Sequence, residues 1–212
     1  MSNKFDEIYQ KSINSPEQFW RDASEDIFWF KKPTKILNKS NPPFYKWYED
    51  GVTNTCYNAL DIHIDQGKGK KTALIYDSPI TGNKSKFTYE ELRSKVSRFA
   101  GALKNQGVDK GDRVIIYMPM IPEAVIAMLA CARIGAIHSV VFGGFASNEL
   151  ASRIDDSKAK LLVTASCGFE PGRTVEYKPL VDEAIKQANH KINKMILFQR
   201  KGHEVKLNAP ME

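Results

Sequence analysis

Two adjacent glycines, Gly143 and Gly144, lie where an apolar strand pattern at 137–142 ends and a helix pattern at 147–157 begins. Glycine at such a turn lets the backbone approach a ligand closely, and amide hydrogens near a helix N-terminus suit a phosphate or pyrophosphate group. Glycine used only for the geometry of a tight turn is the alternative, and the dipeptide by itself favours it. Neither GxGxxG nor GxxxxGK(S/T) occurs in the chain, so the two common nucleotide-binding loops are not predicted.

Three further residues could contact a ligand near this turn. Phe142 and Phe145 flank the glycines, and their rings would either stack on a base or fill the core, with core filling favoured. Arg173 follows the next strand pattern, which places it at the same edge of the sheet if these segments are βα units. Its planar guanidinium suits a phosphate, although an ion pair with Glu170 or Glu176 fits the spacing equally well.

The elements that must position these residues alternate between strand and helix from Lys71 onward. Strands are predicted at 72–76, 113–118, 137–142, 160–165 and 195–199, and helices at 88–107, 122–134, 147–157 and 179–189. The strands are apolar on both faces, which predicts an α/β fold with a parallel sheet and helices on both faces. The last strand would leave an edge unpaired.

Helix ends are marked clearly in two places. Thr88 followed three residues later by Glu91 is a capping box, which predicts the start of the first long helix. Pro122 and Glu123 suit the first turn of the next helix, and Gly135 suits its end.

Residues 1–62 differ from the remainder of the chain. All three tryptophans lie there, at positions 20, 29 and 47, among many other aromatic residues and several prolines. This composition predicts short helices and irregular segments that form an N-terminal extension capping a larger α/β region at 63–212. The segment after 200 shows no periodicity.

Composition excludes several classes of function. The net charge of +6 is spread along the chain, so no nucleic-acid partner is predicted. No apolar stretch is long enough to span a bilayer and no targeting signal is recognised, which predicts a cytoplasmic protein without a membrane partner. Three separated cysteines and four histidines without ligand spacing predict buried thiols and no metal site. The consecutive Asp155 and Asp156 would point to different helix faces, so no catalytic residue is assigned.

Four segments together carry a family resemblance. They are Met118–Glu123, Ala130–Ala136, Val141–Phe145 and Arg153–Ser157. They closely resemble the AMP-forming short-chain acyl-CoA synthetases, the acetate and propionate ligases of the adenylate-forming superfamily, and the similarity runs from about Phe5 to Arg200. The resemblance identifies residues 1–62 as the N-terminal extension of these enzymes and 63–212 as an incomplete first α/β subdomain of their AMP-binding domain.

The resemblance implies a two-step reaction. A short-chain carboxylate attacks ATP, with Mg, to give an acyl-adenylate and pyrophosphate, and the thiol of coenzyme A then displaces AMP. Propionate is favoured over acetate, because acetate-type enzymes carry a second arginine where this chain has Glu170. The resemblance implies that Phe142, Gly143, Gly144 and Arg173 help to hold coenzyme A.

The same resemblance implies that much of the ATP site is not found in these 212 residues. The phosphate loop, acyl pocket, ribose-binding aspartate, hinge and C-terminal domain of the family have no counterpart in the sequence, so the isolated chain is expected to be inactive. The alternative is a non-catalytic module that associates with the missing C-terminal part of a split synthetase or with a full-length one. A Rossmann dehydrogenase is disfavoured, because the dinucleotide fingerprint is absent.

Overall fold

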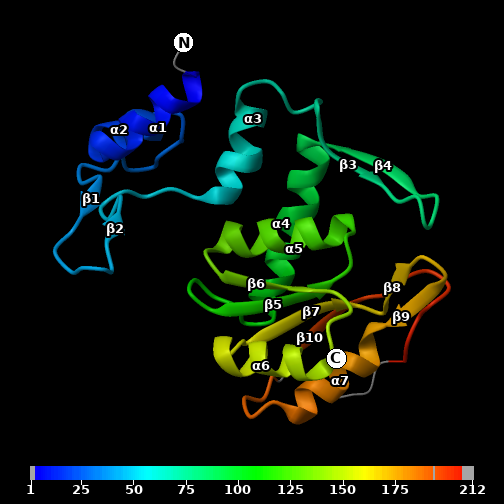
Figure 1. Cartoon of the computed structure of the whole chain (residues 1–212). Coiled ribbons are helices and arrows are strands. Elements are labelled where there is room, and N and C mark those ends of the chain that lie inside the picture. Colours follow the sequence, from blue (N-terminus) through cyan, green and yellow to red (C-terminus); the bar gives the residue numbers. More distant parts are fainter. Residues whose placement is uncertain (1–2, 193, 207–212) are drawn as a thin grey trace. The chain divides into compact units, whose positions relative to one another are not determined.

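The computed structural model describes residues 3–192 and 194–206, and the chain divides into two compact units, Met1–Asn54 and Thr55–Glu212 (Figure 1). The predicted end of the α/β region and the last six residues of the aperiodic segment lie outside the described residues. The predicted boundary between 62 and 63 stays a prediction.

The first unit consists of short elements joined by irregular segments. Its helices are α1 (Lys4–Asn14) and α2 (Pro16–Ser24), and its two-residue strands β1 (Leu37–Asn38) and β2 (Lys46–Trp47) pair antiparallel. The Trp29 indole donates a hydrogen bond to the Ser24 carbonyl over 2.9 Å and packs against the Tyr48 ring with 5.4 Å between centroids. Aromatic packing therefore stabilises this unit, as its composition predicts.

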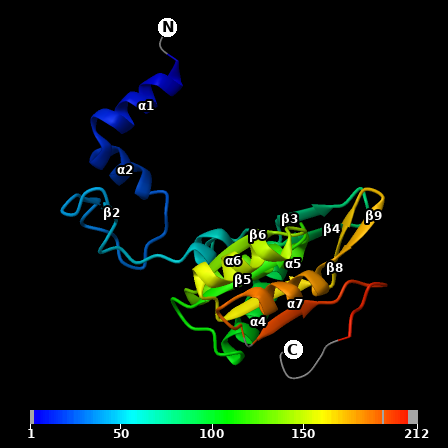
Figure 2. The same ribbon diagram turned by 60° about the horizontal axis from the view of Figure 1, so that its bottom comes forward.

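The second unit is built on a four-stranded parallel sheet. The strand order is β10 (Met195–Phe198), β7 (Leu161–Ala165), β5 (Arg113–Met118) and β6 (Ile137–Phe142). Helices α4 (Tyr89–Asn105) and α5 (Pro122–Ile134) cover one face, and α6 (Ser147–Ser157) and α7 (Tyr177–Gln187) cover the other (Figures 1 and 2). The predicted α/β fold is confirmed. Before the sheet come η1 (Tyr57–Asp61), a π-helical turn, and α3 (Ile62–Asp65).

Strand β5 supplies the centre of both hydrophobic layers. Val114 and Ile116 are fully buried in the cluster that contains α4 and α5, whereas Ile115 and Tyr117 are fully buried in the cluster that contains α6 and α7. Because side chains alternate across a strand, every residue of this apolar run is used in one core or the other.

The predicted helix ends are confirmed. The Thr88 side chain accepts a hydrogen bond from the Glu91 amide, and the Glu91 carboxylate accepts one from the Thr88 amide over 2.8 Å. Pro122 begins α5, and Gly135 ends it with a left-handed φ of 73°.

Two segments differ from the expected βα alternation. Strand β3 (Thr72–Asp77) does not join the parallel sheet but pairs antiparallel with β4 (Lys84–Thr88). The segment after β7, for which no strand is predicted, contains a second antiparallel hairpin, β8 (Cys167–Glu170) with β9 (Arg173–Glu176). A short turn closes an antiparallel pair, whereas a parallel pair needs a long crossover. Strands β3 and β8 are each followed by a short turn that leads into the partner strand.

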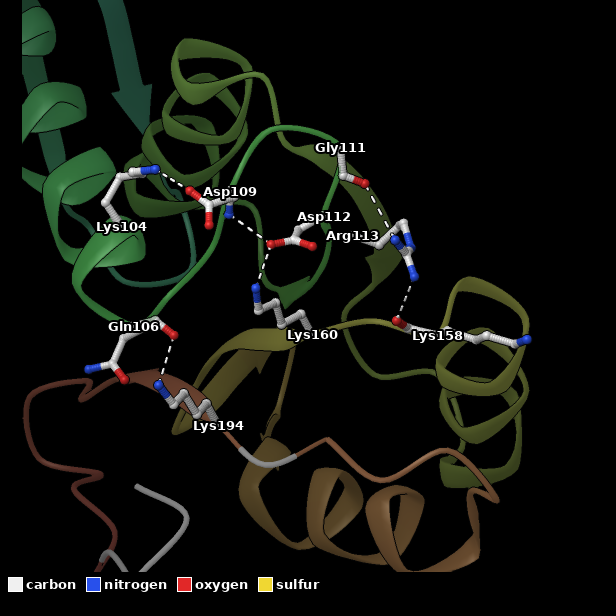
Figure 3. A network of polar contacts seen from close by, with 9 residues as sticks. All are labelled: Lys104, Gln106, Asp109, Gly111, Asp112, Arg113, Lys158, Lys160 and Lys194. Atoms are coloured by element: carbon white, nitrogen blue, oxygen red, sulfur yellow. Dashed lines mark hydrogen bonds and ion pairs between the residues drawn. The ribbon is translucent and has the colours of Figure 1, made fainter.

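A network of polar contacts connects the loops at the amino edge of the sheet (Figure 3). The Asp112 carboxylate accepts hydrogen bonds from Lys160 Nζ over 2.7 Å and from the Asp109 amide over 2.8 Å, which hold the pKa of Asp112 below its usual value. Arg113 Nε donates to the Ser157 carbonyl over 2.8 Å. These contacts place the charged side chains at the edge opposite to the one that carries the glycine turn.

Across residues 3–192 and 194–206, no helix has the length and apolarity needed to cross a bilayer.

Candidate functional site

The structure brings the two predicted ligand-binding loops to the carboxyl edge of the sheet. Strand β6 ends at Phe142, directly before the glycines, and β7 leads into the β8–β9 hairpin. A methyl group placed on Gly144 would lie 3.6 Å from Glu170 Oε1, so the glycine turn and the end of β8 are neighbours. Loops at this edge of a parallel sheet are where α/β proteins bind ligands.

The glycine turn is held by two buried tyrosines. The Gly144 amide donates to the Tyr117 hydroxyl over 3.0 Å, and this hydroxyl donates to the Phe145 carbonyl over 2.8 Å. Gly144 has a φ of +98°, which disfavours any residue with a side chain. A methyl group on Gly143 would lie 2.5 Å from the Tyr177 hydroxyl. Both glycines are therefore required by the turn itself, and the Gly144 amide already has a partner inside the protein.

The phenylalanines beside the turn are on the surface. The side chains of Phe142 and Phe145 are 64% and 43% exposed, and their ring centroids lie 5.6 Å apart. The preference for core filling was wrong. Their position explains the exposure: β6 is an edge strand of the described sheet and only Val141 of its residues is buried, while Phe145 lies in the turn after β6. Two exposed aromatic rings at this edge are suited to stacking on a base.

Arg173 forms an ion pair with Glu170 across the end of the hairpin. Its Nε and Nη2 atoms lie 2.7 Å and 2.6 Å from the same Glu170 oxygen. Of the two alternatives that the spacing left open, the structure has the ion pair. Both side chains are solvent-exposed, so the pair is weak enough for a ligand to compete for the guanidinium.

A pocket of 330 Å³ opens at this edge, and we call it the carboxyl-edge pocket. Its walls come from the β3–β4 turn, the segment after β5, the end of β6, the β8 hairpin and the residues after β10. The lining is mostly apolar, and it includes Phe142, Gly143, Phe169, Glu170, Tyr177 and Arg200. Gly144 and Arg173 adjoin the pocket without lining it.

Sequence reasoning missed Arg200, which lines the pocket from the segment after β10. Its guanidinium carbon lies 4.3 Å from the centroid of the Phe169 ring, a cation–π contact. The signal was available, because Arg200 follows the last predicted strand and the residues after parallel strands gather at one edge of the sheet. Beside it, burial raises the pKa of Tyr177 to about 12, so this hydroxyl is neutral at physiological pH.

The three cysteines are thiols enclosed in the protein interior. Cys56, Cys131 and Cys167 are all buried, as predicted, and burial raises the pKa of Cys131 to about 12. Asp155 accepts hydrogen bonds from the His190 amide and from Asn189 Nδ2 over 2.7 Å and 3.0 Å, so its carboxylate fixes a loop.

Two family models match the chain. One described as "AMP-binding enzyme" matches residues 62–210, and one described as "Acetyl-coenzyme A synthetase N-terminus" matches residues 5–59. A solved structure, acetoacetyl-CoA synthetase from Streptomyces lividans, superposes with a TM-score of 0.85 and 24% identity, covering 97% of this chain and 31% of that chain. At this identity the likeness shows the fold alone.

Curated relatives are much more similar in sequence. The human protein named Acyl-CoA synthetase short-chain family member 3, mitochondrial, is 54% identical over 202 residues, which are 95% of this chain and 29% of that protein. The Propionate--CoA ligase of Escherichia coli (strain K12) is 48% identical over 196 residues, which are 92% of this chain and 31% of that protein. The chain thus spans less than a third of the length of these relatives. With a family model matched over more than half of its residues, the chain belongs to the family of AMP-binding enzymes, and its relatives are short-chain acyl-CoA synthetases.

Proposed function

We propose that this chain forms the N-terminal part of an acid–CoA ligase. The complete enzyme would activate a short-chain carboxylate with ATP and Mg to give an acyl-adenylate and pyrophosphate, and would then transfer the acyl group to the thiol of coenzyme A. The observation that carries this proposal is the pair of family matches, which together extend over residues 5–59 and 62–210. In such transfers an enzyme acts chiefly by positioning the reactants and by neutralising phosphate charge.

Propionate is the favoured substrate and acetate the next. The sequence argument is Glu170, which stands where acetate-type enzymes are expected to carry an arginine. The name of one relative adds support, because it is called a propionate--CoA ligase. A cytoplasmic location also remains a prediction, and the human relative carries the word mitochondrial in its name.

Coenzyme A is the ligand that we assign to the carboxyl-edge pocket. The exposed rings of Phe142 and Phe145 suit stacking against the adenine. The turn at Gly143 and Gly144 lets the ligand approach the backbone. Arg173 would bind a phosphate group of coenzyme A once its ion pair with Glu170 is broken. Both the placement of the two rings and the approach of the ligand to the backbone depend on the turn geometry that Tyr117 maintains.

The 212-residue chain, purified alone, is expected to catalyse no ATP–pyrophosphate exchange with either propionate or acetate. The reason is that the proposed site supplies contacts for coenzyme A but not the groups that neutralise the phosphates of ATP. The measurement is incorporation of labelled pyrophosphate into ATP, with the Escherichia coli propionate--CoA ligase as the positive control. A rate well above the blank without enzyme would contradict the proposal of inactivity.

A second candidate function is that of a module that associates with the remainder of a synthetase. The observation that favours it is the edge strand β6, where Ile137, Val140 and Phe142 are exposed and which carries no lysine or acidic residue. Charged residues normally protect a strand edge from pairing with another chain, and this edge lacks them.

Co-expression tests the second candidate. The chain would be produced with a tagged polypeptide comprising the part of the Escherichia coli ligase that follows the matched region, and co-purification is expected together with restored ligation of propionate. Val140→Lys should abolish co-purification, because it puts a charge on the apolar edge. Ile75→Lys is the matched control, since Ile75 is similarly exposed but lies on β3. Absence of any complex, or equal loss with both variants, would rule this edge out.

A further inference from the structure

One segment of the first unit, residues 27–48, combines lysines and aromatic rings without any acidic residue, and we call it the basic aromatic segment. It contains lysines at positions 31, 32, 35, 39 and 46, and aromatic residues at positions 28, 29, 30, 44, 45, 47 and 48. It contains no aspartate or glutamate, although the chain as a whole has 25 acidic residues in 212. Five lysines and no acid give this segment a formal charge of +5.

The lysines of this segment are exposed, and three of them have no acidic partner. All five are exposed to solvent. Lys32 pairs with Glu25, and Lys46 pairs with Glu49 over 3.1 Å. Among the described residues, no carboxylate lies within 4.0 Å of the ammonium group of the other three, Lys31, Lys35 and Lys39. The segment therefore presents three positive charges that no acidic side chain of the described residues neutralises.

The loop between β1 and β2 presents aromatic rings to solvent (Figure 1). Phe44 is 75% exposed and Tyr45 is 49% exposed. Lys39 begins this loop, and Lys46 directly follows it. The two rings do not belong to a core, because Ile36 is the only buried hydrophobic residue among residues 3–54. Apolar rings and lysines thus lie next to each other in one exposed loop.

Lysines beside exposed aromatic rings fit a membrane surface better than a protein partner. Lysine is depleted in protein–protein interfaces, because burial of its charge is costly. At a membrane surface, the alkyl stem of a lysine lies along the apolar layer while its ammonium group stays in water among the headgroups. Tyrosine and tryptophan are enriched at the same depth, because their rings have an apolar body and a polar atom.

Helix α1 provides a second apolar surface in the same unit. Phe5, Ile8, Tyr9 and Ile13 have exposed fractions between 47% and 66%. Residues with this spacing lie on one face of a helix. Such a face suits the boundary between headgroups and acyl chains. It offers no contact to a nucleic acid, the other polyanion that lysines and aromatic rings together could bind.

We propose that the first unit binds the surface of membranes that contain anionic phospholipids. Phe44 and Tyr45 enter the headgroup layer, and Lys31, Lys35 and Lys39 contact the lipid phosphates. The sequence predicts no membrane partner because no stretch is long enough to span a bilayer, but binding at the surface requires no such stretch. This proposal does not depend on the proposed ligase function.

Vesicles of phosphatidylcholine with and without phosphatidylserine test the proposal. All three tryptophans lie in the first unit, so tryptophan emission reports on this unit alone. The unsubstituted chain should sediment with the vesicles that contain phosphatidylserine. Its emission should shift to shorter wavelength and be quenched by bromine on the acyl chains. Binding should weaken as salt is added, because ions screen exposed charges.

Two variants separate the contribution of the charges from that of the rings. Lys35→Glu combined with Lys39→Glu should lower the partition coefficient about 25-fold or more, because each lysine near an anionic surface contributes about a factor of five. Phe44→Ser should lower it about tenfold and reduce the quenching by bromine. All these positions are exposed, so the unfolding curves should stay close to that of the unsubstituted chain.

Exposed residues of the second unit provide the matched controls. Lys70→Glu combined with Lys71→Glu changes the net charge by the same amount as the first variant. Ile75→Ser removes an apolar side chain that is 65% exposed. Both controls should change the partition coefficient much less than the matched variants of the first unit.

Three outcomes would overturn the proposal. The first is equal partitioning into vesicles with and without phosphatidylserine, or no binding to either. The second is a loss of binding in the variant of Lys70 and Lys71 as large as that in the variant of Lys35 and Lys39. The third is tighter binding of a single-stranded oligonucleotide than of the anionic vesicles, which would make the basic aromatic segment a nucleic-acid surface. None of these readouts depends on ligase activity, so failure here leaves the proposed function untouched.

Discussion

Replacing Ile116 with alanine is expected to lower the free energy of unfolding of the unit that begins at Thr55 by about 2–5 kcal/mol. Ile116 is 0% exposed and lies in the middle of β5, inside the layer that α4 and α5 form with the sheet. Removal of its outer atoms would leave a cavity between rigid elements, because strands on both sides of β5 fix the backbone. Urea unfolding followed by far-ultraviolet circular dichroism measures the loss.

Val140→Ala is the matched control for this variant. Val140 is paired with Ile116 in the sheet register, but its side chain is 55% exposed on the edge strand β6. The expected change is below about 0.5 kcal/mol, the range usual for surface substitutions. A loss at Val140 as large as the loss at Ile116 would show that the edge of β6 is covered in solution, contrary to the strand order described above.

Gly143→Ala is the second substitution with a large expected effect, about 3 kcal/mol of destabilisation. The added methyl group would lie 2.5 Å from the Tyr177 hydroxyl and 2.8 Å from the Met118 carbonyl oxygen. Because one of these contacts is with backbone, a side-chain rotation cannot relieve both. The turn would have to shift, and coenzyme A binding is expected to weaken together with stability.

Gly101→Ala is expected to raise the free energy of unfolding, because the steric clash that destabilises Gly143→Ala is absent at this position. Gly101 lies in α4, and no atom lies within 4 Å of the methyl group that alanine would add. Alanine is favoured in a helix, so we expect an increase in stability of up to about 1 kcal/mol. All three tryptophans are in residues 1–54, so circular dichroism is preferable to tryptophan fluorescence for both glycine variants. Similar stabilities of the two variants would contradict the steric explanation.

Much of the parallel sheet could be predicted from local sequence signals. The predicted strands at 113–118 and 137–142 have the bounds of β5 and β6, and the predicted helix at 147–157 has the bounds of α6. A proline at the start and a glycine at the end marked α5 equally well. These signals are properties of a few consecutive residues, so they need no knowledge of distant contacts.

The two hairpins were not predicted, for a different reason. The segment 72–76 has the composition of a strand whether it joins a parallel sheet or pairs with a neighbour. The choice is made by hydrogen bonds to β4, which depend on the path of the chain after Asp77. The same applies to β8 and β9, where the sequence predicts no strand.

By itself, the sequence determined the type of fold, the edge of the sheet at which the glycine turn lies, and the family that the motifs resemble, because apolar runs, helix ends and motifs are all local. Only the tertiary structure decided the state of each candidate side chain. It gave Arg173 a partner in Glu170, exposed Phe142, directed the Gly144 amide to Tyr117, and brought Arg200 into the pocket. Each of these outcomes depends on distances between atoms that are often many residues apart in the chain, and neither residue type nor spacing specifies those distances.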